Sequence, residues 1–359
     1  MAAMTAWLGL PIDVPLLLAP MAGFGTVELA IGVARAGGLG ALACASLTPA
    51  QADEALDAFR AACPGQPLNA NFFCHAPPAS SDDSAWRAQL APYFAEFGVD
   101  PSSIAPAAGR RPFDDEACAW VVRARPEVVS FHFGLPAAPL LARVRATGAR
   151  ILSSATTVRE AVWLAERGCD AVIAQGAEAG GHRGMFLATD ASQQIGTFAL
   201  VPQIADAVRV PVVATGGIAD GRGIAAAFAL GASAVQLGTV YLTCPEARTS
   251  ALHRRALADA RDDATALTNV FTGRPARGIA NRLMREQGPL SAVAPAFPLA
   301  AAALAPLRAR AEAAGSADFT NLWSGQAAKL APATPEPAEA LTARLVRDAR
   351  AVAGKLRVL

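Results

Sequence analysis

The stretch from Asp170 to Gly184, DAVIAQGAEAGGHRG, decides the fold. Its first part, Ala171 to Ala174, is a short apolar run typical of a strand that is buried on both faces. A glycine-rich polar turn that contains His182 follows at once. Parallel α/β barrels build their active sites in this way, because the loops after the strands can vary while the barrel stays rigid. The stretch therefore predicts a barrel strand that opens into a functional loop, and an ordinary tight turn is the alternative interpretation.

Three residues of this loop are candidates for chemistry. Gly180 and Gly181 have no Cβ, so the backbone there can approach a flat ligand closely or adopt a positive φ. His182 is the side chain of the loop whose ordinary pKa, about 6.5, lies near neutrality. A histidine that merely bonds a nearby carbonyl group is the alternative.

Eight short apolar runs recur along the chain, and most are separated by a stretch with helical character. The runs are Leu16–Ala19, Leu39–Ala43, Leu68–Phe72, Val128–Phe133, Arg150–Ser153, Ala171–Gln175, Val212–Thr215 and Ala234–Leu237. The helical stretches are Val27–Ala36, Pro49–Ala62, Ala137–Thr147, Thr157–Arg167, Thr197–Val208 and Gly221–Leu230. Several are followed by glycine, the residue expected just past a helix C-terminus. Eight strand–helix units predict an α/β fold, a (β/α)8 TIM barrel, because a doubly wound open sheet gives no reason for the number eight.

Two segments fall outside this repeat. An insertion at 75–127 contains a helix-like run near Trp86–Phe97, and the pattern becomes irregularly helical after about Pro245. We expect residues 1–244 to form the barrel and residues 245–359 to form a mostly helical segment that, with the insertion, covers its C-terminal mouth. His253 lies among arginines and is expected at the surface.

Composition narrows the classes of partner. Of the 359 residues, 17% are charged and 53% are hydrophobic, and the net charge is +1, so neither nucleic acid nor an anionic membrane surface is an expected partner. The uncharged run Pro289–Leu307 contains three prolines, which favours buried helix and turn over a membrane span. The six cysteines are scattered without a CxxC pair, so we expect neither a metal site nor a disulfide framework. We expect a cytoplasmic location, because a reducing compartment suits free cysteines. No secretion signal is indicated, and the sequence leaves open whether a homo-oligomer forms.

The stretch Val212–Thr239 predicts a phosphate site. Gly216–Gly217 follows the seventh strand, and Gly238 with Thr239 follows the eighth. In barrels, the loops after these two strands bind phosphate with bare backbone N–H groups and a helix N-terminus. Two ordinary turns are the alternative. Asp220 is expected to cap the helix that follows.

Other strand ends add polar or flat surfaces to the same mouth. Pro20 and the small residues around it let the main chain run flat against a planar ring, with Met21 as a polarisable cover. Asn71 ends the third strand, and its amide can both donate to and accept from a heterocycle. His132 ends the fourth strand, and the sequence is equally compatible with two roles for it, a contact with substrate or a histidine packed within the barrel.

Five motifs taken in order, APMAGFGT, NANFFCH, AQGAEAGGHRG, TGGIADGRG and AVQLGT, together resemble the nitronate monooxygenase family, formerly called 2-nitropropane dioxygenases. The resemblance extends into the tail through FTGRPARGIANRLM and LWSGQAA. It implies an FMN-dependent TIM barrel that oxidises alkyl nitronates with O2 to a carbonyl compound and nitrite, with propionate 3-nitronate as the expected natural substrate.

The resemblance also implies roles for residues. It makes His182 the active-site histidine, either a base toward a neutral nitroalkane or a group that orients an anionic nitronate. His132 and Phe297 are the candidates for substrate contact, and Phe297 is the only aromatic residue in a stretch, 296–308, where some members of the family carry tyrosines and a lysine. The FMN-binding residues are expected to be Ala19, Pro20, Met21, Asn71, Gln175, Gly180, Gly181, Gly216, Gly217, Gln236, Leu237, Gly238 and Thr239.

Two other functions remain compatible with these motifs. An FMN-dependent NAD(P)H oxidoreductase of the enoyl-acyl-carrier-protein reductase or quinone reductase kind would share the fold and an AGGH-like loop. A non-catalytic flavin-binding barrel is the third reading.

Overall fold

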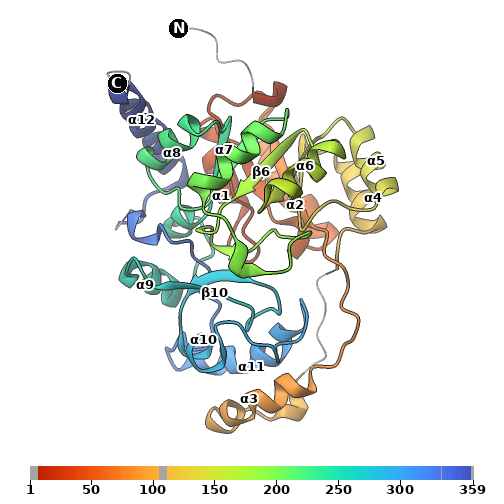
Figure 1. The fold of residues 1–359 in the computed structure, drawn as a ribbon, viewed down its shortest axis with the longest axis vertical. Coiled ribbons are helices and arrows are strands. Elements are labelled where there is room, and N and C mark those ends of the chain that lie inside the picture. Colours follow the sequence, from red (N-terminus) through yellow and green to blue (C-terminus); the bar gives the residue numbers. More distant parts are fainter. Residues whose placement is uncertain (1–6, 105–110, 333, 357–359) are drawn as a thin grey trace.

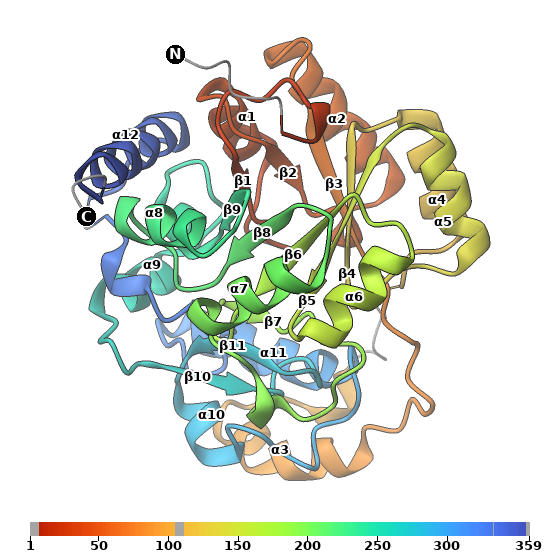
Figure 2. The same ribbon diagram turned by 45° about the horizontal axis from the view of Figure 1, so that its top comes forward.

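The eight apolar runs form one parallel sheet in the computed structural model of the chain, which describes residues 7–104, 111–332 and 334–356. The sheet order is β1-β9-β8-β6-β5-β4-β3-β2, and a parallel bridge between Leu17 and Leu39 brings β1 back to the β2 edge. The sheet thus closes, which confirms the predicted (β/α)8 barrel (Figure 2). Its strands are β1 (Leu16–Leu18), β2 (Gly40–Leu42), β3 (Leu68–Phe73), β4 (Val128–His132), β5 (Arg150–Ala155), β6 (Ala171–Gln175), β8 (Val212–Thr215) and β9 (Ala234–Leu237).

The strands are buried on both faces, as their continuous apolar runs predict. Side chains that point inward, such as Leu17, Leu152 and Ile173, fill the floor of the barrel. Side chains that point outward pack beneath the helices in the largest hydrophobic cluster of the molecule. The rigid cylinder therefore fixes where each strand ends, and these ends position the loops of the mouth.

A ring of helices surrounds the barrel. It consists of α1 (Val27–Arg35), α2 (Pro49–Ala62), α4 (Asp115–Ala124), α5 (Ala138–Ala146), α6 (Val158–Glu166), α7 (Thr197–Ala207), α8 (Gly221–Ala229) and α12 (Ala338–Leu356). Short polar side chains begin many of them; Thr48 forms a capping box with Gln51, and Asp220 accepts from the first N–H groups of α8. Because α4 belongs to this ring, the insertion expected at 75–127 is shorter than predicted.

The last helix, α12, takes the eighth place in the ring and packs against both α8 and α1 (Figures 1 and 2). The contact with α8 is close, because a Cβ on Gly221 would lie 2.5 Å from the backbone nitrogen of Ala349. The expectation that all of 245–359 covers the mouth is therefore wrong for α12. Residues 245–337 therefore form a long insertion between the eighth strand of the barrel and the eighth helix of the ring.

A second layer, which we call the cap, consists of residues 84–104 and 265–323. It contains α3 (Ser84–Glu96), β10 (Thr265–Thr268), β11 (Ala276–Ile279), α10 (Arg282–Gln287) and α11 (Ala300–Ala313). Its helices gather at one end of the molecule around a hydrophobic cluster of their own, which includes Trp86, Leu307 and Phe319 (Figure 1). The antiparallel sheet β10-β11-β7 joins the cap to the barrel loop that carries β7 (Gly181–His182). The remaining elements are α9 (Ala251–Asp259) and the short 3-10 turns Trp7–Gly9, Cys44–Ser46, Pro101–Ser103, Ala191–Gln193, Thr239–Thr243 and Ala328–Leu330.

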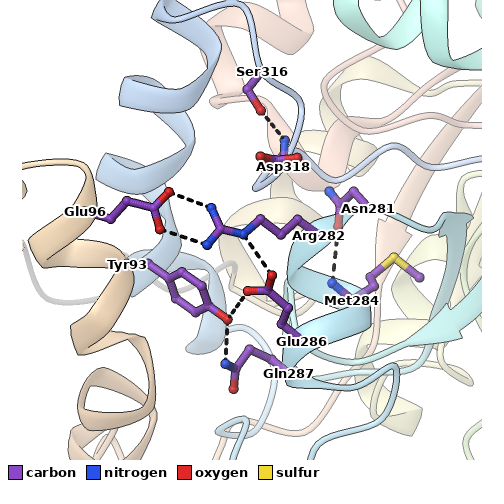
Figure 3. Close-up of polar contacts among 9 residues, drawn as sticks. All are labelled: Tyr93, Glu96, Asn281, Arg282, Met284, Glu286, Gln287, Ser316 and Asp318. Carbon is purple, nitrogen blue, oxygen red and sulfur yellow. Dashed lines mark hydrogen bonds and ion pairs between the residues drawn. The ribbon is translucent and has the colours of Figure 1, made fainter.

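Polar contacts align α3 with α10 at the rim of this cluster (Figure 3). Arg282 donates to both carboxylate oxygens of Glu96 at 2.7 and 2.8 Å and to Glu286 at 3.0 Å. The Tyr93 hydroxyl donates to Glu286 at 2.8 Å and accepts from Gln287 at 2.7 Å. Because these charges are exposed to solvent, the network contributes little to stability and mainly aligns the two helices, while the buried apolar side chains stabilise the cap.

The described part of the chain holds no helix that is both long and apolar enough to cross a membrane. The uncharged run Pro289–Leu307 forms a loop and the first two turns of α11.

Candidate active site

The loop after β6 is closed by hydrogen bonds at both ends. The Gln175 amide donates to the His182 carbonyl at 3.0 Å and accepts from the Gly184 nitrogen at 2.7 Å. Arg183 is fully buried and donates to the carbonyl oxygens of Gly176 and Gln175 at 2.8 and 2.7 Å. Burial lowers the pKa of Arg183 to about 9, so the guanidinium remains charged at neutral pH. The glycine-rich turn is thus a fixed structure that holds His182 at the mouth.

His132 supports the same carbonyl group from β4, which lies two strands from β6 in the sheet. Its Nε2 lies 3.1 Å from the His182 oxygen, and its Nδ1 lies 3.0 Å from Ser154 Oγ. A carbonyl can only accept, so Nε2 carries the hydrogen and Nδ1 accepts from the hydroxyl. Burial lowers the pKa of His132 to about 3, which keeps the ring neutral. His132 also lines the cavity described below, but both of its ring nitrogens bond the protein.

The imidazole of His182 is held by the cap. Its Nε2 lies 2.9 Å from Thr272 Oγ1, in the loop between β10 and β11. The rings of Phe297 and Trp323 lie 5.3 and 5.6 Å from it between centroids, and Phe133 lies at 6.0 Å in an edge-on arrangement. The barrel therefore fixes the main chain of His182, whereas its ring is contacted both by the cap and by Phe133 at the end of β4.

One cavity at the C-terminal ends of the strands brings together most of the residues expected from the sequence. Leu237 is not among its lining residues, because its side chain points outward into the core under the helices. Phe297 reaches the site through its contact with His182 and not as a lining residue. The expected residues that do line the cavity are Ala19, Pro20, Met21, Asn71, His132, Gln175, Gly180, Gly181, His182, Gly216, Gly217, Gln236, Gly238 and Thr239.

The C-terminal part of the chain adds residues that line the cavity and that the sequence analysis did not assign to the site. They are Thr272 and Asn321 with Trp323, Ser324 and Gly325. Gly325 donates to Thr239 Oγ1 at 2.9 Å, which closes the cavity over the end of β9. The motifs FTGRPARG and LWSGQ contain four of these five residues, so a signal was present, but it did not indicate which side chains face the cavity.

Two amides in the cavity suit a flat heterocycle with donors and acceptors on its edge. Gln236 is 8% exposed, and its Oε1 is a buried acceptor without a hydrogen bond inside the described protein. The Asn71 amide nitrogen donates to the oxygens of Ser130 at 2.9 and 3.2 Å, so its oxygen is what it can offer a ligand. Gly180 allows the backbone at Gly325 to approach the loop closely, because a Cβ at residue 180 would lie 2.5 Å from the Gly325 nitrogen.

The predicted phosphate site needs one revision. Asp220 accepts from the nitrogens of Arg222 and Gly223 at 2.9 and 3.1 Å, as a helix cap does. The N-terminus of α8 is therefore occupied by its own side chain. What the loops after β8 and β9 can offer an anion is the backbone around Gly216, Gly217 and Gly238.

The buried Glu160 and the half-buried Arg274 support the segment that follows His182. Glu160 accepts from the backbone nitrogens of residues 186–188 at 2.7, 2.9 and 3.2 Å. Arg274 donates to the Met185 carbonyl and stacks 3.9 Å above the ring of Phe133. Across the residues that the structure describes, His, Cys, Asp and Glu form no group able to hold a metal ion.

Comparison with known proteins finds relatives from the same enzyme family. The sequence profile of the nitronate monooxygenase family matches residues 5–348. A nitronate monooxygenase of Paraburkholderia phytofirmans is 40% identical over 353 residues, which cover 97% of this chain and 95% of that protein. One of Pseudomonas aeruginosa is 41% identical over 349 residues, covering 95% and 97% respectively.

Solved structures agree. A nitroalkane oxidase from Streptomyces ansochromogenes has a TM-score of 0.87 and 38% sequence identity, covering 96% of this chain and 98% of that one. FabK from Thermotoga maritima has a TM-score of 0.74 and 27% identity, covering 97% and 96%.

Proposed function

The chain belongs to the nitronate monooxygenase family and is an enzyme of this type, and we propose that it uses FMN to oxidise alkyl nitronates with O2 to a carbonyl compound and nitrite. The observation that carries this proposal is the meeting of His182 with the ends of β1, β3, β8 and β9 around one cavity. The ends of β1 and β3 offer a place for a planar ring, the glycine backbone after β8 and β9 offers one for a phosphate, and His182 lies where a small substrate would meet the ring.

The residues of the cavity fit FMN in kind. Gln236 and Asn71 supply amide groups for the edge of the ring, and Met21 supplies a polarisable cover at the end of β1. The glycine backbone after β8 and β9 would hold the phosphate. Bound there, FMN would supply the electron transfer, while the protein supplies position and excludes water.

His182 is the residue that we expect to act on the substrate. Its main chain is fixed by Gln175 and His132, so the ring turns only about its own side-chain bonds. Toward a neutral nitroalkane it would remove the proton beside the nitro group, and toward an anionic nitronate it would orient an oxygen. A positioned base contributes about 10²–10⁴-fold to the rate.

The test begins with the visible spectrum of the purified full chain, followed by nitrite release on addition of an alkyl nitronate. We expect a yellow protein that releases nitrite, and a His182→Asn variant that keeps the flavin and loses most of the turnover. A protein that does not take up FMN would refute the proposal. Unchanged turnover in His182→Asn would remove the catalytic assignment of the histidine and favour a flavin-binding barrel with another role.

The AGGH-like loop, which an enoyl-acyl-carrier-protein or quinone reductase of this fold would share, supports a second candidate, reduction of a bound flavin by NAD(P)H. Anaerobic mixing with NADH or NADPH separates the two functions. Rapid loss of the flavin colour favours the reductase, whereas a flavin that stays oxidised favours the nitronate-oxidising enzyme.

A further inference from the structure

We propose that Thr197, at the start of α7, is a positioning residue for the cofactor. Its hydroxyl holds the Gly216 carbonyl, so that the N–H of Gly217 is turned toward the cavity, where it can bind the phosphate of FMN. This inference rests on the proposed function, because it concerns how the same cavity would hold one end of the flavin. Thr197 is not among the residues that line the cavity, so it acts through the turn after β8.

The turn after β8 is in direct contact with the Thr197 hydroxyl. Thr197 Oγ1 lies 2.9 Å from the carbonyl oxygen of Gly216. Gly216 and Gly217 have φ values of +113° and +69°, which glycine adopts without strain. A Cβ on Gly216 would lie 2.9 Å from the same hydroxyl oxygen, so the two segments are tightly packed. The hydroxyl therefore limits how the Gly216 carbonyl can turn.

The peptide bond passes this constraint on to the next N–H group. The bond between Gly216 and Gly217 is trans. In a planar trans peptide, the C=O and N–H groups point in opposite directions. With the carbonyl directed at Thr197, the N–H of Gly217 points away from α7. Because Gly217 lines the cavity and Thr197 lies outside it, this N–H is the one that an anion in the cavity can reach.

Thr197 is itself held by Glu178, in the loop after β6. The Thr197 nitrogen donates to both carboxylate oxygens, at 2.8 and 3.0 Å, and the hydroxyl lies 2.8 Å from one of them. The carboxylate and the Gly216 carbonyl thus share the one hydroxyl hydrogen. Gly176 leaves space for this contact, because a Cβ there would lie 2.5 Å from the Thr197 nitrogen. One threonine therefore joins the loop that carries His182 to the turn after β8.

The negative charge of Glu178 lies close to the same turn, since a Cβ on Gly217 would lie 3.3 Å from the Glu178 Cβ. Two arginines balance this charge. Burial lowers the pKa values of Arg183 and Arg277, and in both the Glu178 carboxylate opposes the shift. Arg277 also donates to the carbonyl of Ala177 at 2.8 Å, next to Glu178 in the chain. Glu178 can therefore hold Thr197 without leaving an uncompensated negative charge beside the phosphate.

The experiment separates the phosphate end of the flavin from its ring. FMN and riboflavin differ only in the phosphate, so the ratio of the riboflavin Kd to the FMN Kd measures what the phosphate contributes. Both values come from the quenching of flavin fluorescence on titration with the full chain freed of flavin. In Thr197→Val, which keeps the shape and loses the hydroxyl, we expect the ratio to fall about tenfold, the worth of one hydrogen bond to a charged group. The riboflavin Kd should stay within about threefold of the wild type.

Two further variants show whether the hydroxyl itself matters. Thr197→Ser restores the hydroxyl and should keep the ratio within about threefold of the wild type. Thr342→Val is the matched control, because it removes a buried hydroxyl that donates to the Ala338 carbonyl at 2.7 Å within α12 and does not line the cavity. Its ratio should equal that of the wild type.

Each other outcome overturns the inference. Equal losses for FMN and riboflavin in Thr197→Val would show that the residue only supports the fold, and an unchanged ratio would show that the turn does not need the hydroxyl. A wild type that binds riboflavin as tightly as FMN would show that the turn does not hold the phosphate, and it would leave nitronate oxidation standing. A wild type that binds neither flavin would end the proposed function and this inference together. Should Thr197→Val not fold, as judged by circular dichroism, Thr197→Ala takes its place beside Thr197→Ser.

Discussion

Glu160→Gln tests whether one buried carboxylate holds the segment that follows His182. Glu160 lies in α6 with no exposed surface. One of its oxygens accepts from the three backbone nitrogens of residues 186–188, and the other accepts from the nitrogen and hydroxyl of Thr156 at 2.7 and 2.8 Å. The carboxylate therefore ties the start of its own helix to the loop beyond the catalytic turn.

The size of the effect follows from this donor set. A glutamine can keep its oxygen toward 186–188 and turn its NH2 group toward Thr156, whose hydroxyl can rotate to accept. The Thr156 N–H then loses its acceptor, and an unsatisfied buried N–H costs about 1–3 kcal/mol. The three remaining backbone bonds lose the assistance of a charge, about 1 kcal/mol each. We expect the free energy of unfolding to fall by about 4–6 kcal/mol.

Urea unfolding of the flavin-loaded protein, followed by circular dichroism, measures this difference. Glu166→Gln is the control, because Glu166 lies on the same helix with a side chain that is 67% exposed. Its free energy of unfolding should stay within about 0.5 kcal/mol of the wild type. A loss below about 1 kcal/mol in Glu160→Gln would show that the loop does not depend on the carboxylate.

Two further predictions concern the cofactor cavity and the response to acid. Gly180→Ala places a Cβ 2.5 Å from the Gly325 nitrogen, so the Kd for FMN should rise about tenfold or more in a fluorescence titration. A Kd within about twofold of the wild type would contradict the steric argument. Burial lowers the pKa values of His132 and His253 to about 3 and about 4, so below pH 6.5 the unfolded chain takes up protons that the folded chain refuses. Between pH 7 and pH 5 the free energy of unfolding should therefore fall by about 2 kcal/mol per histidine, and His253→Gln should remove about half of that dependence; a flat profile over this range would contradict it.

The barrel could be predicted because its signals are local. Each strand is a short apolar run, and a run buried on both faces is recognisable without knowing its neighbours. The predicted helix ends hold as well, since Gly37, Gly148, Gly168 and Gly231 all adopt the positive φ that ends a helix. Asp220 caps α8 for the same local reason.

Predictions that depended on tertiary packing were less successful. His253 was expected at the surface because arginines flank it, yet it is 1% exposed, stacks edge-on against Phe24 at 5.3 Å and lies 3.0 Å from the Trp323 carbonyl oxygen. The neighbouring Arg254 turns inward and donates to backbone carbonyls, including that of Thr243 at 2.7 Å. A charged neighbour in the sequence was therefore no sign that His253 is exposed to solvent. The place of α12 in the helix ring could not be predicted either, because the chain returns to α8 and α1 only after the whole cap has been built.

The contacts of His182 were beyond sequence reasoning for the same reason. The glycine-rich loop identified the histidine, but not the group that orients its ring. Thr272 and Trp323 lie in irregular segments with no periodic pattern, and they reach His182 through the fold of the cap. A motif can name the residues of such a segment without indicating which side chain points to the site.

The loop that carries His182 has an energetic difficulty that its surroundings resolve. Ordering a backbone costs about 1–2 kcal/mol per residue, and glycines cost the most, so a turn rich in glycine would not hold a catalytic ring by itself. The Gln175 amide both donates and accepts at the end of the loop, the buried Arg183 guanidinium donates to two of its carbonyls, and the β7–β11 ladder adds backbone bonds from the cap. Because the guanidinium stays charged even when buried, its bonds to the two carbonyls are of the stronger kind. The flexibility that lets the backbone approach a flat ligand is therefore limited by side chains outside the space that the ligand would fill.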